Sequence, residues 1–112
     1  MDRICTSIEQ SKKFLKLGLD INTADCYWDY DILKKEHYPM FMDEQFDDTC
    51  IPAWSLGALL VLMPNHYVVE KCNENSYACY FMTNMEKRGK TPIEAVYNMI
   101  CYLLENNPYD KI

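Results

Sequence analysis

Glycine is scarce in this sequence, and its three glycines, Gly18, Gly57 and Gly89, stand far apart. The dinucleotide-binding pattern G-x-G-x-x-G and the P-loop pattern G-x-x-x-x-G-K-[ST] both need closely spaced glycines. Neither pattern can be built here, so the sequence excludes the two common Gly-rich phosphate-binding loops.

Long apolar runs and a surplus of positive charge are also missing. The longest apolar stretch covers only residues 56–63, whereas a membrane-spanning helix needs about 18 residues or more. The first five residues form no hydrophobic signal core. The 11 basic and 17 acidic residues give a net charge of −6. Binding to nucleic acids or to membranes is therefore not expected, because both attract clustered Lys and Arg. We expect a protein of the cytoplasm.

The six cysteines lack the spacing of a metal site. Structural zinc sites pair their ligands about two to four residues apart, but the closest cysteines, Cys72 and Cys79, are seven apart. Neither His37 nor His66 has a Cys or His within three residues. Disulfides are not expected in a reducing cytoplasm. The sequence therefore predicts six free thiols, no metal and no cofactor.

Two helices are indicated at the ends of the chain. Residues 7–17 predict a helix with Thr6 and Glu9 as its capping box and Gly18 after its last turn. Residues 91–105 predict a second, clearer helix, because Thr91-Pro92-Ile93-Glu94 combines an N-cap, a proline at the first helical position and a capping-box Glu. The expected apolar face of this helix consists of Ile93, Val96, Tyr97, Ile100, Leu103 and Leu104.

Between these helices the sequence predicts two hairpins and a short helix. Residues 26–32 alternate as in a strand and residues 38–42 follow as an edge strand containing Pro39, although a short helix after Thr23 is the alternative. Residues 43–50 are expected to form an acidic, solvated loop without the calcium-loop spacing. A buried helix is expected over residues 56–63 after the N-cap Ser55, and a second hairpin from residues 67–69 and 77–82. Residues 84–90 are expected to be a polar loop.

The predicted fold class is therefore α+β. A chain of 112 residues, 49% apolar and 13% aromatic, suffices for a single folded domain over residues 1–112. Its predicted order is α-β-β-α-β-β-α, with the helices packed on a small antiparallel sheet.

No catalytic constellation is evident, and we do not expect an enzyme. Cys26, Cys50 or Cys101 could pair with a histidine only if the fold brought the two together. The carboxylate pairs at 29/31, 43/44 and 47/48 lie in polar stretches, whereas catalytic carboxylates are usually held in pockets that separate their pKa values.

The unusual feature of the sequence is a group of aromatic residues interleaved with acids. Tyr and Trp are enriched in interface hot spots, although core packing explains such residues equally well. Trp28 and Tyr30 should share one face of a strand, and if that face is core, Tyr27 and its acidic neighbours face outward. The candidate interaction residues are Tyr27, Tyr38, Asp43, Glu44 and Phe46.

Three segments carry a resemblance to other proteins: residues 5–11, residues 51–60 with their Pro-Ala-Trp-Ser-Leu core, and residues 91–106. In these segments the chain resembles short uncharacterised proteins encoded by Bacteroides-type gut bacteria, their prophages and mobile elements. The resemblance implies no activity, cofactor or site residue. It implies a phage or mobile-element accessory protein, a kind that often binds a component of the host or of its defences.

The leading hypothesis is accordingly a non-enzymatic protein that acts by binding another protein. One alternative is an acidic nucleic-acid mimic that inhibits a host defence component, with carboxylates of residues 20–48 on one face. A second alternative is a small-ligand sequestering protein with an aromatic pocket and one or two cations. A third is an undetected enzyme.

Overall fold

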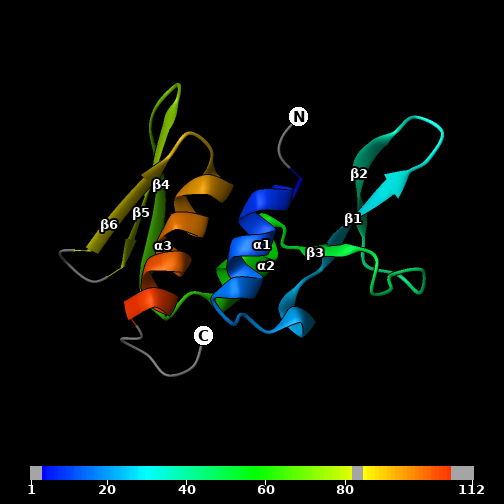
Figure 1. The fold of residues 1–112 in the computed structure, drawn as a ribbon. Coiled ribbons are helices and arrows are strands. Elements are labelled where there is room, and N and C mark those ends of the chain that lie inside the picture. Colours follow the sequence, from blue (N-terminus) through cyan, green and yellow to red (C-terminus); the bar gives the residue numbers. More distant parts are fainter. Residues whose placement is uncertain (1–3, 82–84, 107–112) are drawn as a thin grey trace.

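The computed structural model describes residues 4–81 and 85–106, which form three α-helices and six β-strands (Figure 1). The strands make two antiparallel sheets, ordered β2-β1-β3 and β4-β5-β6. The α+β class and the predicted order are confirmed, with two small sheets instead of one and with β3 and β6 as additional strands. The elements are α1 (Ile8–Lys16), the 3-10 helix η1 (Ile21–Thr23), β1 (Cys26–Asp31), β2 (Glu36–Phe41), β3 (Ile51–Ala53), α2 (Leu56–Leu62), β4 (Tyr67–Asn73), β5 (Ser76–Phe81), β6 (Met85–Gly89) and α3 (Pro92–Asn106).

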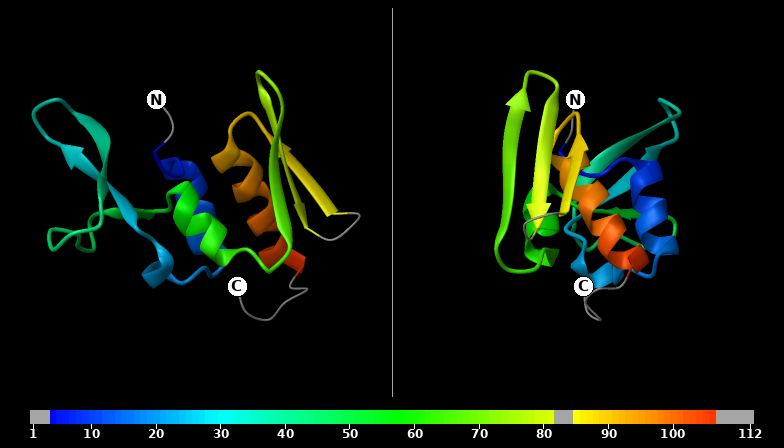
Figure 2. Two further views of the ribbon diagram at one scale, coloured as in Figure 1. Left: turned by 180° about the vertical axis from the view of Figure 1, so that it is seen from behind. Right: turned by 90° about the vertical axis from the view of Figure 1, so that its left-hand side faces the viewer.

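The helices α1 and α2 occupy the middle of the molecule. Figure 2 shows the hairpin β1–β2 extending from one side of them, with α3 and the sheet β4-β5-β6 on the other side. The molecule is accordingly elongated and thin, with principal extents of 48 × 34 × 19 Å. The projecting hairpin therefore exposes more of its surface than a strand pair inside a sandwich would.

Helix α1 is capped by Ser7 and not by the predicted Thr6. The Ser7 hydroxyl accepts a hydrogen bond from the Gln10 backbone N–H (3.1 Å), and the Gln10 side chain accepts one from the Ser7 backbone N–H (2.9 Å). This is a complete capping box, shifted by one residue from the predicted Thr6–Glu9 pair. Gly18 follows the helix with a φ of +93°, in agreement with its predicted place after the last turn.

Thr6 instead connects helix α1 to the first sheet and to Trp54, which follows β3. Its fully buried hydroxyl accepts from the Trp54 backbone N–H (3.1 Å) and hydrogen bonds with the Ser11 hydroxyl (2.8 Å). Its backbone donates to the Trp54 carbonyl (2.9 Å) and accepts from Nε1 of Trp28 (2.9 Å). A residue that binds its neighbours from four directions is unavailable as a helix cap, which explains the shift to Ser7.

The strand prediction for the first sheet is confirmed over the helical alternative. Strand β2 is an edge of the sheet, and Pro39 lies in it opposite Trp28. Backbone N–H groups of an antiparallel strand point alternately toward and away from the partner. The Met42 N–H donates to the Asp25 carbonyl (2.9 Å), so the ring nitrogen of Pro39, three residues earlier, faces the free edge. Proline therefore removes no bond of the ladder there.

The second sheet contains a strand where a polar loop was expected. The prediction for residues 84–90 is wrong over Met85–Gly89, which pairs with β5 as β6; residue 84 lies outside the described residues. Met85 and Lys87 are half-buried, whereas Glu86 and Arg88 are exposed. A hydropathy pattern does not show this alternation, because one of the half-buried residues is a lysine. The stem of Lys87 packs along α3, and its ammonium lies 4.6 Å from the Tyr102 ring centroid.

Helix α2 is less buried than its apolar sequence predicted. Ser55 caps it as expected, accepting from the Ala58 backbone N–H (3.2 Å). Within the helix only Leu59 is fully buried, while Val61 is 83% exposed. The prediction of burial on all sides is therefore wrong. The helix lies at the surface of the molecule and turns one side toward α3.

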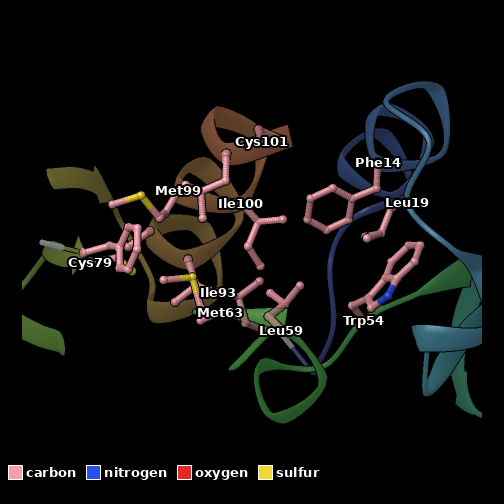
Figure 3. Close-up of a cluster of buried hydrophobic side chains, with 14 residues drawn as sticks. Phe14, Leu19, Trp54, Leu59, Met63, Cys79, Ile93, Met99, Ile100 and Cys101 are labelled. Carbon is pink, nitrogen blue, oxygen red and sulfur yellow. The ribbon is translucent and has the colours of Figure 1, made fainter. Parts of the chain in front are cut away.

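Helix α3 supplies most of the main core. Ile93, Val96 and Ile100 are buried as predicted, whereas Tyr97 and Leu104 are only half-buried. The helix packs both on the sheet β4-β5-β6 and on α2, so its buried surface is wider than one stripe. Figure 3 shows the side chains of α3 facing Phe14, Leu19 and Trp54 across the cluster. Leu103 of the predicted face is also buried, and the additional buried residues of α3 are Ala95, Met99 and Cys101.

All six cysteines are free, and only Cys72 among them is exposed. Of the helices in residues 4–81 and 85–106, none is long and apolar enough to cross a membrane. Within the same residues no group of three or more His, Cys, Asp or Glu side chains could hold a metal ion.

Candidate functional site

The structure brings three of the predicted interaction residues together, but as a packed cluster. Tyr27 is fully buried, and its hydroxyl donates to Oδ1 of Asp43 (2.7 Å). The Phe46 ring packs on it edge to face, with ring centroids 5.4 Å apart. Because its side chain is fully buried, Tyr27 cannot itself contact a partner as an interaction residue. Tyr27 instead anchors the loop that follows β2 to the hairpin.

The loop over residues 43–50 is organised by its own carboxylates. Oδ1 of Asp43 also accepts from the Gln45 backbone N–H (2.9 Å). Oδ1 of Asp47 accepts from the Thr49 backbone N–H (2.8 Å) and hydroxyl (2.6 Å). The hydrogen bonds from Thr49 hold the pKa of Asp47 below its usual value. Glu44 is exposed on this loop, so the acidic segment is ordered and presents charge to solvent.

One face of the hairpin gathers acidic side chains around two large apolar ones. Residues directly opposite each other in antiparallel strands point to the same side. The observed pairs are Tyr27 with Met40, Asp29 with Tyr38 and Asp31 with Glu36. We call the part of this side beyond the buried Tyr27 the acidic face. It consists of the half-buried Asp29 and Asp31 and the exposed Glu36, Tyr38 and Met40. Tyr38 is 37% exposed, and its hydroxyl donates to Oδ2 of Asp29 (3.4 Å).

Negative charge is concentrated in this part of the chain. Residues 20–48 contain nine acidic and two basic residues, a net charge of −7. Since the whole chain carries −6, the remaining residues carry +1. Asp20 and Asp25 precede the hairpin, so the hairpin and the loop after it, residues 26–50, contain seven acidic and two basic residues, a net charge of −5.

Exposed apolar side chains are concentrated in the same part. Of the twelve large apolar side chains that are exposed within residues 4–81 and 85–106, seven lie between residues 30 and 42. Ile32 and Leu33, which we call the hairpin tip, are 77% and 93% exposed. Patches of this kind on soluble proteins mark interaction sites more often than isolated apolar residues do. The seven residues are Tyr30, Ile32, Leu33, Tyr38, Met40, Phe41 and Met42.

The opposite side of the hairpin faces a cleft of about 630 Å³. Its walls come from the segment around Cys5 that leads into α1, from Trp28 and its neighbours in the hairpin, and from Lys90 and Thr91 together with the first turn of α3. Trp28 is half-buried in the cleft, whereas Tyr30, two residues further along, is 47% exposed. The prediction that Trp28 and Tyr30 are either both buried or both exposed is therefore wrong. The hairpin leaves the body of the protein between these two positions.

The thiols of Cys5 and Cys26 lie together beside this cleft. Cys5 lines it and is 5% exposed, and Cys26 is fully buried. The hydrogen bond from the Cys26 thiol lowers the pKa of Cys5, and the same bond raises the pKa of Cys26. His37 also lines the cleft. The Cys26 thiol is also hydrogen bonded to Asp25, but His37 makes no hydrogen bond to either thiol among the described residues, so we assign no catalytic role here.

No family model, no curated protein and no solved structure matches this chain. The function is therefore argued from the geometry of the hairpin and of the cleft.

Alkaline pH is expected to destabilise the fold. The bond to Asp43 raises the pKa of Tyr27, desolvation raises that of Tyr97, and burial raises that of Cys79 to about 11. Unfolded Cys and Tyr ionise near pH 8.5 and near pH 10. Above about pH 8.5 the unfolded chain therefore releases protons that the folded chain retains, and the free energy of unfolding falls. Urea unfolding between pH 7 and pH 11 under reducing conditions measures this decline. The Tyr27→Phe variant should lose less stability above pH 10, and a stability that stays constant to pH 11 would contradict the prediction.

Proposed function

We propose that this protein acts by binding another protein, and that it does so through the hairpin β1–β2. The contact surface is the acidic face together with the hairpin tip. The observation that carries the proposal is the coincidence, in the projecting hairpin and the loop that follows it, of seven of the twelve exposed large apolar side chains of the described residues with a net charge of −5 over residues 26–50.

The chemistry of this surface defines the partner. Apolar side chains as exposed as Ile32 and Leu33 gain free energy, about 25 cal/mol for each Å² removed from water, when a partner covers them. The carboxylates around Tyr38 and Met40 attract a surface of opposite charge and increase the rate of association. The partner is thus a protein with a basic surface that surrounds an apolar pocket.

A phage or mobile-element accessory role is consistent with such a partner. The resemblance of residues 5–11, 51–60 and 91–106 to short proteins of Bacteroides-type bacteria and their mobile elements supports this setting. A basic partner surface is also what DNA-binding defence proteins present to phosphates. The placement of Asp29, Asp31 and Glu36 on one face supports the narrower proposal that the protein competes with nucleic acid for such a surface.

Capture from a lysate of the organism that encodes the chain, with matched variants, tests the proposal. The test variant combines Ile32→Ser and Leu33→Ser at the hairpin tip, and a second test variant carries Glu36→Lys on the acidic face. The control is Val61→Ser on α2, because Val61 is 83% exposed and lies outside the hairpin. We expect a captured protein that the wild type and the Val61→Ser control retain equally and that both hairpin variants lose.

The outcome can also go against the proposal. If the hairpin variants retain the same proteins as the control at unchanged affinity, the hairpin is not the binding surface. If light scattering shows that the wild type self-associates and the tip variant does not, the hairpin pairs two copies of this chain instead. Release of the captured protein by duplex DNA would support competition with nucleic acid.

A further inference from the structure

The cleft on the inner side of the hairpin has the size and lining of a small-molecule site. Ligand pockets in proteins typically measure about 300–1,000 Å³ and combine apolar walls with a few polar groups. This cleft, at about 630 Å³, is lined on its apolar side by Trp28, Pro39, Ile93 and Ile4. It faces away from the acidic face, so its occupant is separate from the proposed protein partner.

Trp28 is fixed in the position of a stacking platform. Its Nε1–H donates to the Thr6 carbonyl (2.9 Å), so the indole is held in one orientation and its polar edge is already satisfied. The half-buried ring therefore offers the cleft an aromatic surface. Pro39 lies opposite Trp28 in the strand pair and extends this surface. A flat ring fits such a wall because aromatic rings gain about 0.5–1.5 kcal/mol from stacking beyond the burial of area.

The polar groups of the cleft are mainly hydrogen-bond donors. The hydroxyls of Ser7 and Thr91 accept from backbone N–H groups (3.1 and 3.0 Å), and their own protons have no acceptor among the described residues. The Gln10 amide oxygen accepts from the Ser7 N–H (2.9 Å), which leaves its NH₂ group to donate. The Lys90 ammonium has no ion-pair partner in the described part of the chain. These groups together favour an anion.

Glu94 is the one carboxylate that lines the cleft. Its Oε1 already accepts from the Lys90 backbone N–H (2.6 Å). This bond places the carboxylate at the first turn of α3, where the helix dipole favours negative charge. The negative charge of Glu94 opposes an anion in the cleft. The hydrogen bond from the Lys90 N–H and the helix dipole of α3 partly offset this charge, and the cleft contains more donor groups than carboxylates.

We propose that this cleft binds a small planar aromatic carboxylate, with the ring against Trp28 and Pro39 and the carboxylate at Lys90. The donors of Ser7, Gln10 and Thr91 line the same cleft. A neutral aromatic compound gains only the stacking, and a cationic one meets Lys90, so both bind more weakly.

Two probes with the same ring and opposite charge test the proposal: 2-naphthoate and 2-naphthylmethylammonium. The chain has two tryptophans, so ¹H–¹⁵N spectra contain two indole N–H signals, which a Trp28→Phe variant assigns. We expect 2-naphthoate to shift the Trp28 signal and to leave that of Trp54 unchanged, because Trp54 is fully buried and donates to Thr23 (2.9 Å). The cationic probe should bind at least about tenfold more weakly, as expected when a charge-assisted bond is lost.

The Lys90→Gln variant separates the anion site from simple apolar binding. Calorimetry should show that this variant binds 2-naphthoate about tenfold more weakly, while a control Lys12→Gln variant, altered on α1 outside the cleft, binds as the wild type does. Three results would overturn the proposal: equal affinity for both probes, unchanged affinity of the Lys90→Gln variant, or no movement of the Trp28 signal at millimolar 2-naphthoate.

Discussion

Replacing Trp54 by alanine is expected to lower the free energy of unfolding by about 3–5 kcal/mol, a large share of the stability of a domain this size. Trp54 is the largest fully buried side chain of the described residues. Its ring packs edge to face on Phe14, with centroids 5.1 Å apart, and its Nε1–H donates to the Thr23 hydroxyl (2.9 Å). Alanine would leave a cavity between α1 and the first sheet and remove both contacts.

Urea denaturation of the wild type and of two variants measures this effect. Trp54→Phe keeps most of the ring volume and loses the bond to Thr23, so it should cost clearly less than Trp54→Ala. If the alanine variant loses less than about 1 kcal/mol, the core can close around the missing ring, and the contacts of Trp54 with Phe14 and Thr23 contribute little to stability. The Trp28→Phe variant provides a comparison, because it changes a half-buried tryptophan of the same sheet. It should lower the free energy of unfolding less than Trp54→Ala does.

The sequence predicted those elements whose local pattern and tertiary environment agree. The helix α3 follows from its N-terminal signature and apolar face, and the strand β1 from the alternation around Trp28. The strand β6 was missed because a lysine stem supplies part of its buried side and the charged tips dominate the composition. The strand β3 was missed because three residues are too short to show any period.

The sequence predicted only part of the candidate site, and the reason differs from the one that applies to the missed strands. Alternation correctly separates Tyr27 from Trp28, but it does not indicate which side another segment covers. The loop over residues 43–50 folds back on Tyr27 through Asp43 and Phe46, so both sides of the strand are covered near its start. The cleft joins residues near 5, 28 and 90, and no short-range pattern relates positions so far apart.

The two glycines Gly57 and Gly89 are expected to respond to alanine with opposite signs. A Cβ on Gly89 would lie 2.5 Å from the Ala95 backbone N and 2.8 Å from two atoms of Glu94. These atoms belong mostly to the backbone of the first turn of α3 and cannot move without shifting the helix against β6. Gly89→Ala should therefore cost about 1–3 kcal/mol or more, as overpacking does. Its φ is not positive, so the penalty is steric.

Gly57 provides the matched control for this prediction. It is exposed within α2, and the nearest atom to an added Cβ is the Ser55 hydroxyl, in ordinary contact at 3.7 Å. Gly57→Ala should raise the free energy of unfolding by about 0.5–1 kcal/mol, because glycine has more backbone freedom to lose in a helix. Chemical denaturation of both variants gives the two signs. If Gly89→Ala leaves the free energy of unfolding unchanged, the start of α3 can move away from β6.

Gly89→Ala should also weaken binding of 2-naphthoate in the cleft. The added Cβ would displace the first turn of α3, and Lys90 and Glu94, which line the cleft, lie just before and within this turn.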